Sequence, residues 1–293
     1  MLPSLVLVPV LLASAQPAPP AGGIVGLCRF DTAQLSFAGS AAEQARCLMQ
    51  PVGKRGQLTG SLRRLPPSLS RVLERGEPLP DRAAVERLLA REAIDIGDLD
   101  QPLSRARDGD PAAPLARYYV IHDTSTPFYG DEPFPADVDR DARVNDFAPY
   151  FPVGADPERF PVAHLFLNRR GEVRVGQPLS RPWRATKLET RVIGLPAKGL
   201  FLHVETVMPR RRDPAIDGWN DAIAPKPGFS ARQYDRLALL YIAASVRAGA
   251  WLIPAQHATM DHGLPQAHDD PQNFRLKDFD RALGRHLRHL RRR

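Results

Sequence analysis

The residues best suited to chemistry in this sequence are its histidines, and all eight lie at or after position 122. His122 and His257 each follow a short apolar run and so stand at the end of an expected strand. Strand ends are where an α/β sheet presents functional side chains. A catalytic zinc ion needs three protein ligands and one open position for water, and these two imidazoles can supply two of the three.

A polar loop at residues 268–272 places carboxylates beside another histidine. Side chains of an extended loop alternate in direction, so His268 and Asp270 are expected to face one way and Asp269 the other. An isolated histidine is more often a structural residue than a ligand. The positions of His122, His257 and His268 favour the functional interpretation.

The apolar run at residues 200–207 contains one acidic side chain, Glu205. Alternation along a strand puts Phe201, His203 and Glu205 on one face. A glutamate in an otherwise apolar strand is costly to bury without a purpose. Glu205 is therefore a candidate general base.

The first residues form an apolar run with small residues at Ala13 and Ala15, although a positively charged beginning is missing. This pattern predicts a signal peptide at residues 1–15 and a periplasmic or secreted protein. The alternatives are an uncleaved anchor or a misplaced start. The run is short for a transmembrane helix, and no other stretch of the sequence is apolar and long enough, so we expect no integral membrane span.

The two cysteines, Cys28 and Cys47, are expected to form a disulfide in such an oxidising compartment. Neither lies near the histidines in sequence, so a metal here must be held by imidazole and carboxylate. The net charge of +7 favours anionic partners such as cell wall. Aromatic and basic residues do not interleave, so we expect no nucleic acid partner. The sequence sets no oligomeric state.

The elements that must position these residues can be read from local patterns. Apolar β-branched runs predict strands, and spaced apolar residues with capping signals predict helices. Strands interspersed with helices indicate an α/β fold with a mixed central sheet flanked by helices. The expected division is a signal peptide at 1–15, an N-terminal accessory region with linker at 16–112, stapled by the disulfide, and a catalytic domain at 113–293. The expected strands are 118–122, 164–167, 172–175, 200–207 and 250–255, and the expected helices are 82–93, 230–249 and 276–287.

Taken in order, several segments resemble the zinc-dependent N-acetylmuramoyl-L-alanine amidases that share a fold with peptidoglycan recognition proteins. Each segment is a weak signal, and their shared order over residues 115–290 is a stronger one. The matching segments are YYVIHDTSTP (118–127), AHLFLNRRGEVRVGQPL (163–179), GLFLHVETV (199–207), the helix at 230–249, IPAQH (253–257) and HDDPQNF (268–274).

The resemblance implies a Zn²⁺ ion with His122, His257 and Asp270 as its ligands. It also implies that Glu205 is the catalytic base. His268 falls two residues before the last ligand, where relatives often carry a Lys or Arg that stabilises the transition state. The implied reaction is hydrolysis of the amide between N-acetylmuramic acid and L-alanine, in peptidoglycan or a muropeptide.

Three departures from the family pattern matter. The stretch between His257 and Asp270 is longer than usual, which leaves Asp261 and His262 as rival ligands. Residues 183–186 read Trp-Arg-Ala-Thr where relatives have Trp-His-Ala-Gly, which affects the expected lining of the cleft. His122 is followed by Asp123, at a position that is not a required ligand. The alternatives to the enzyme are a peptidoglycan-binding module of the same fold that does not cleave, and a structural protein without metal.

Overall fold

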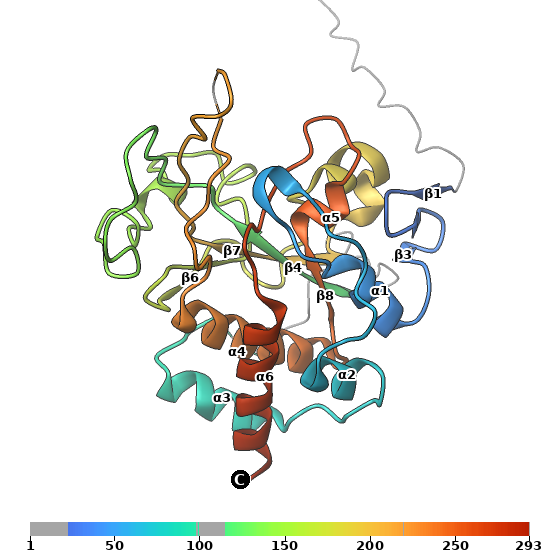
Figure 1. Cartoon of the computed structure of the whole chain (residues 1–293). Coiled ribbons are helices and arrows are strands. Elements are labelled where there is room, and N and C mark those ends of the chain that lie inside the picture. The colour runs from blue at the N-terminus through green and yellow to red at the C-terminus, as the bar shows by residue number, and fades with distance from the viewer. Residues whose placement is uncertain (1–22, 98, 100–114, 219, 293) are drawn as a thin grey trace, which may run out of the picture.

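The computed structural model describes residues 23–97, 99, 115–218 and 220–292. Its centre is a five-stranded sheet in the order β6-β5-β7-β4-β8, in which β6 is the antiparallel edge strand. Helices flank this sheet (Figure 1), so the predicted α/β class with a mixed sheet is confirmed. The expected signal peptide at 1–15 and residues 100–112 at the end of the expected accessory region and linker lie outside the described residues. The strands are β4 (Tyr118–Asp123), β5 (Leu165–Leu167), β6 (Val173–Val175), β7 (Phe201–Thr206) and β8 (Ile253–Gln256).

Strand β4 is central, and each of its residues is buried. It pairs in parallel with β7 on one side and β8 on the other, and its register places His122 beside Glu205. Because β4 and β7 are parallel, their carboxyl ends meet at the same edge of the sheet. The register therefore brings two of the predicted site residues together.

Alternation along β4 assigns the two faces of the sheet to different partners. The Tyr119 hydroxyl donates to the Leu237 carbonyl 3.2 Å away, on the helix α4 (Ala231–Ala248). The Tyr118 hydroxyl is on the other face, where it donates to Gln44 and accepts from the Phe37 amide, both at 2.9 Å. His122 shares the face of Tyr118, so the site lies on the side of the sheet away from α4.

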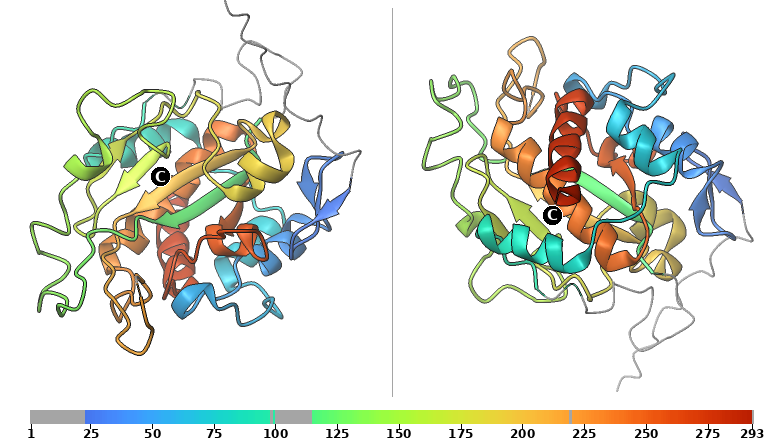
Figure 2. Two further views of the ribbon diagram at one scale, coloured as in Figure 1. Left: turned by 90° about the horizontal axis from the view of Figure 1, so that it is seen from above. Right: turned by 90° about the horizontal axis from the view of Figure 1, so that it is seen from below.

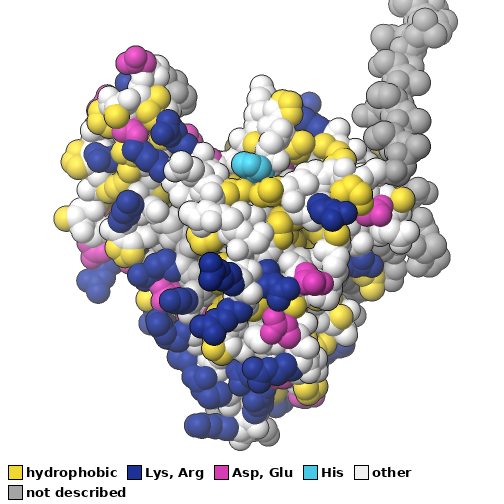
Figure 3. All heavy atoms as spheres, turned by 45° about the vertical axis from the view of Figure 1, so that its right-hand side comes forward, with side chains coloured by type: hydrophobic (Ala, Val, Ile, Leu, Met, Phe, Trp, Pro, Cys, Tyr) yellow, Lys and Arg dark blue, Asp and Glu magenta, His cyan; other side chains and the backbone are white. Residues whose placement is uncertain are grey.

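Helices α4, α6 (Leu276–Arg291) and α3 (Arg82–Arg91) form the layer beneath the sheet (Figure 2). Helix α4 begins at the predicted capping box of Ser230 and Gln233 and ends at Gly249, whose φ of +73° suits glycine. Helix α6 runs four residues further than predicted because Leu290 continues its buried stripe. Lys and Arg side chains gather at the tapered end of the molecule where α6 ends (Figure 3).

Residues 24–48 of the N-terminal region pack on the site face of the sheet, at the amino end of β4 and β7. Further along, the Leu69 amide donates to Asp280 of α6 at 2.8 Å, so the region also reaches the helix layer. Phe37 contacts Tyr118 edge to face with ring centroids 5.2 Å apart, and Phe30 joins the same core. The predicted disulfide between Cys28 and Cys47 is present. This region contains β1 (Ile24–Val25), β2 (Phe30–Asp31), β3 (Ser36–Phe37), α1 (Ala41–Leu48), the 3₁₀ turn η1 (Lys54–Gly56) and α2 (Pro67–Leu73).

Apart from the small N-terminal elements, the structure differs locally from the sequence prediction around the site. Strand β8 starts three residues later than expected, and His257 begins a short helix, α5 (His257–Asp261). Further helical segments that were not predicted are η2 (Ala148–Tyr150), the π-helical η3 (Leu188–Ile193) and η4 (Leu195–Ala197). Within the described residues, no helix combines the length and the apolar character needed to cross a bilayer.

Candidate metal centre

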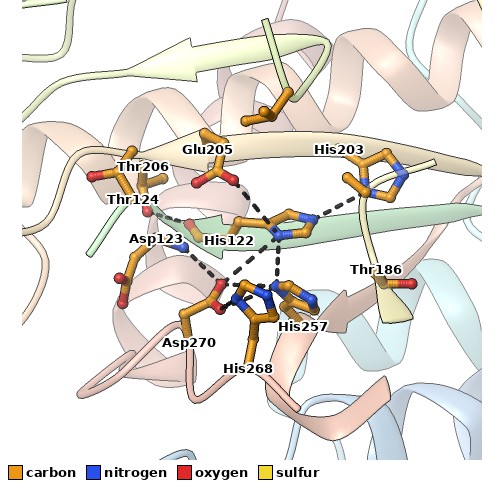
Figure 4. Close-up of polar contacts among 12 residues, drawn as sticks. His122, Asp123, Thr124, Thr186, His203, Glu205, Thr206, His257, His268 and Asp270 are labelled. Atoms are coloured by element: carbon orange, nitrogen blue, oxygen red, sulfur yellow. Dashed lines mark hydrogen bonds and ion pairs between the residues drawn. The ribbon is translucent and has the colours of Figure 1, made fainter. Parts of the chain in front are cut away.

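Three side chains from distant parts of the sequence converge at the carboxyl end of β4 (Figure 4). His122 belongs to β4, His257 starts α5, and Asp270 lies on the loop before α6. All three are buried, and their ligand atoms lie within 4.8 Å of one another. The two Nδ1 atoms are 2.9 Å apart, His257 Nδ1 lies 3.0 Å from Asp270 Oδ1, and His122 Nδ1 lies 3.8 Å from Asp270 Oδ2.

These separations fit a small tetrahedral cation. Zn²⁺ binds imidazole nitrogen and carboxylate oxygen at about 2.0–2.2 Å, so two ligand atoms at tetrahedral positions are roughly 3.3–3.6 Å apart. The three observed separations, from 2.9 to 3.8 Å, bracket that value. The cluster can therefore hold a metal ion, and two nitrogens with one oxygen leave a fourth position free for water.

The outer nitrogen of His257 is fixed by a carboxylate. His257 Nε2 lies 2.9 Å from Asp261 Oδ2, and an ionised carboxylate can only accept, so Nε2 carries the proton. The Nδ1 lone pair then faces the cluster. Asp261 is itself held by the backbone amides of Lys187 and Leu188, at 3.0 and 2.9 Å. Asp261, a rival ligand in the sequence, thus contacts His257 from the side away from Asp270.

The protonation of the outer nitrogen of His122 is also set by a carboxylate, but through a second imidazole, His203, that lies between them. His203 Nε2 lies 3.3 Å from Glu189 Oε1, so His203 donates there and its Nδ1 is left to accept. That Nδ1 lies 3.0 Å from His122 Nε2, which must then be the donor, and the Nδ1 lone pair of His122 again faces the cluster. Glu189 accepts from the Thr186 amide and hydroxyl.

The hydrogen bonds that start at the outer nitrogens of His257 and His122 therefore both lead to one segment, residues 185–189. Its amides hold Asp261 and Glu189, and these two carboxylates set which nitrogen of each ligand histidine is free. Partners of this kind orient ligating histidines and raise their basicity. Alternation along β7 already placed His203 on the face of Glu205, but nothing in the sequence connected it with Glu189.

The ionisable groups of the cluster shift one another's pKa values. Burial lowers the pKa of His122 well below its usual value, and the neighbouring His257 and His203 lower it further. Burial also opposes charge on His257, but Asp270 and Asp261 outweigh it and raise its pKa well above normal. Burial alone would raise the pKa of Asp270, yet His257 holds it well below. A cation at this position would compete with the His257 proton, as at other histidine metal sites.

Glu205 stands beside the cluster without belonging to it. Its Oε1 lies 3.8 Å from His122 Nδ1, and its Oε2 is buried with no hydrogen-bond partner among the described residues. Burial, followed by the charge of Asp270, raises the pKa of Glu205 well above the ordinary glutamate value. A buried carboxylate costs free energy when it is left unpaired. A water molecule or substrate group bound to a metal ion in this cluster would give Glu205 Oε2 a hydrogen-bond partner.

The site opens into a cleft with a volume of about 1050 Å³. Glu205, His257 and Asp270 line its floor together with His268, whose side chain is half exposed. His268 stacks on His257 with ring centroids 4.5 Å apart, and its Nδ1 is 3.6 Å from Asp270 Oδ1. The surface is hollowed between two raised parts of the molecule (Figure 3). The Trp183–Thr186 segment also lines the cleft.

A buried ion pair ties the ligand loop to the end of β4. Asp123 receives two hydrogen bonds from Arg210 at 2.7 and 2.8 Å and one from the Gln272 amide at 3.0 Å. The Asp123 amide in turn donates to Asp270 Oδ2 at 3.0 Å. Asp123 and Arg210 therefore hold the Asp270 loop against β4, a role that the sequence did not suggest.

The structure thus brings His122, His257, Asp270, Glu205 and His268 into one place. His262, the other rival ligand, is exposed and lies outside the cluster. Comparison with known protein families, with curated proteins and with solved structures finds no match to this chain.

Because Asp261 holds His257, we expect Asp261→Asn to weaken zinc binding by about 10–100-fold, the usual effect of losing such a partner. Asparagine keeps the size of the side chain but removes its charge. The dissociation constant is measured by competition with a chromophoric chelator, with Asp95→Asn as the matched control because Asp95 is exposed and lies outside the cleft lining. An unchanged zinc affinity in Asp261→Asn, at unchanged thermal stability of the metal-free protein, would contradict this role.

Proposed function

We propose that this protein is a zinc-dependent amidase that cleaves the bond between N-acetylmuramic acid and L-alanine in peptidoglycan or muropeptides. The observation that carries the proposal is the buried His122–His257–Asp270 cluster, which opens on a cleft beside an unpartnered carboxylate, Glu205. Two neutral nitrogens and one anionic oxygen would leave a bound Zn²⁺ with net positive charge. This ligand set is one that catalytic zinc sites use.

A zinc ion held there would lower the pKa of a water molecule and polarise the amide carbonyl. Side chains of the protein would carry out the proton transfers and stabilise the oxyanion. Glu205 would take the proton of the attacking water and return it to the leaving amine of L-alanine. His268, half exposed beside Asp270, would donate a hydrogen bond to the developing oxyanion. No covalent intermediate with the chain is needed.

The substrate class is supported by the order of sequence segments, by the expected export and by the size of the cleft. A volume of about 1050 Å³ is at the upper end of small-molecule sites, which suits a sugar joined to a peptide. The disulfide is compatible with an extracellular location. A basic chain with a net charge of +7 suits an anionic cell wall.

The test begins with the metal. We expect about one zinc ion per purified chain, measured by inductively coupled plasma mass spectrometry. The zinc-loaded protein is then incubated with purified sacculi, and released stem peptides are identified by mass and by their new N-terminal L-alanine. Release of intact stem peptides that stops on removal of zinc and returns on its addition is the expected result.

Two other outcomes separate the alternatives. Bound zinc, with binding to sacculi but no release, would identify a peptidoglycan-binding module. Absence of zinc after refolding with a metal excess would identify a structural protein in which His122, His257 and Asp270 have no shared role. Either result overturns the amidase proposal.

A further inference from the structure

The loop from Val52 to Leu58 in the N-terminal region reaches the cleft. Val52 and Leu58 form an isolated β-bridge at its base, and the Gly53 amide donates to the Gln57 carbonyl at 2.8 Å. The turn η1 lies between these contacts. The loop is therefore closed on itself and presents Arg55 at its tip.

Three contacts fix this loop in place, two of them to the stretch that carries Asp270. The Asn273 amide donates to the Val52 carbonyl at 3.1 Å, and Lys54 makes an ion pair with Asp213. Gly56 has a φ of +68° and lies so close to Asp269 that an added Cβ would stand 3.1 Å from its Cα and Cβ. The loop is thus packed against the same stretch, 268–273, that carries His268 and Asp270.

Arg55 occupies an unfavourable backbone conformation and is exposed. Its φ of +57° and ψ of +37° lie in the left-handed region, which non-glycine residues adopt rarely and at a cost. Such conformations concentrate at ligand-binding sites. The Arg55 side chain lines the cleft, and its guanidinium makes no ion pair or hydrogen bond with the residues that the structure describes. Its charge acts weakly on Asp213, which Lys54 already binds.

The other charges of the cleft leave a place for an anion. Arg184 and Lys187, both half-buried, also line the cleft, and their side chains make no ion pair within the described part of the chain. Two acids of the cleft are engaged, since Glu158 pairs with Arg181 and Asp269 accepts from Gln272. The half-buried Asp221 also lines the cleft and adds a negative charge near Asp269, which the three cations outnumber. Free cations along a cleft attract an anionic ligand, and a guanidinium matches a carboxylate with two parallel hydrogen bonds.

We propose that the 52–58 loop is one wall of the substrate site and that Arg55 binds a carboxylate of the substrate. The inference rests on the proposed function for the identity of that substrate, a peptide joined to a sugar. It assigns to the N-terminal region a direct part in choosing the substrate.

The experiment compares two muramoyl peptides that differ only in whether the side-chain and terminal carboxyl groups are free or amidated. For Arg55→Ala, KM for the free-acid peptide is expected to rise roughly tenfold, as for loss of one charged hydrogen bond, with kcat nearly unchanged. KM for the amidated peptide should not change. Gly56→Val, which displaces the loop from Asp269, should reduce the same discrimination. Arg64→Ala is the control, because Arg64 is exposed in the same region and lies outside the cleft lining.

Equilibrium binding keeps this test independent of the amidase activity. If the wild-type protein cleaves neither peptide, calorimetric titration with both peptides still reports whether the free acid is preferred and whether Arg55→Ala removes that preference. Loss of preference with Arg55→Ala supports the proposal even when the amidase activity fails. Equal binding of the two peptides by the wild-type protein, or an equal effect of Arg55→Ala on both, overturns it.

Discussion

Glu205→Gln is expected to slow amide hydrolysis by about 10²–10⁴-fold, the range for loss of a general base, while the protein keeps its zinc. Glutamine fills the same space but cannot take a proton from water. The buried Oε2 of Glu205 has no described partner, so the substitution breaks no structural hydrogen bond at that atom. The rate is measured with a muramoyl peptide at saturating zinc, together with zinc content and thermal stability.

Glu158→Gln is the matched control, because Glu158 lines the same cleft but pairs with Arg181 at the rim. Its activity should remain within a few-fold of the wild type. Full activity of Glu205→Gln with a normal zinc content would show that another group, or none, moves the proton. A parallel loss of zinc and activity would instead place Glu205 among the metal ligands.

The sequence predicted the central strands well because their signals are local. Runs such as 118–122 and 200–207 are apolar, β-branched and bounded by breaks, and both appear as strands β4 and β7 within one residue at each end. The capping box at Ser230 and the glycine at 249 likewise set the bounds of α4. The small elements of the N-terminal region have two-residue strands, which are too short for any periodicity to reveal.

Some of the candidate site residues were also predicted because their signals are local in the sequence. His122, Glu205 and His257 stand at or near strand ends, a position that can be read from sequence. The supporting contacts cannot be, since Glu189 reaches His203 only because an unpredicted π-helical segment folds beside β7. The sequence leaves Asp261 as a rival ligand. Recognition of the short helix 257–261 would have shown that it stands at i+4 from His257 and so can contact that ring.

His257→Ala is expected to weaken zinc binding by on the order of 10²–10³-fold. Zinc sites with four protein ligands bind with about 10–16 kcal/mol, so each ligand contributes roughly 2.5–4 kcal/mol, or about two to three powers of ten in affinity. The substitution also leaves Asp270 without the hydrogen bond and ion pair that hold its pKa low. Chelator competition measures the affinity, and Co²⁺ spectra of the loaded protein report the change in coordination.

His262→Ala is the control that decides between the two histidines. His262 lies five residues further along the chain, at the end of α5, and is exposed. Its removal should leave zinc affinity and the Co²⁺ spectrum unchanged. The reverse pattern, with zinc lost in His262→Ala and kept in His257→Ala, would mean that the 257–270 stretch rearranges on binding the ion. Such a rearrangement would break the contact of Asp261 with His257 and the amides of residues 187 and 188, so Asp261→Asn would then have no effect on zinc affinity. The three variants together therefore test one arrangement of the metal centre.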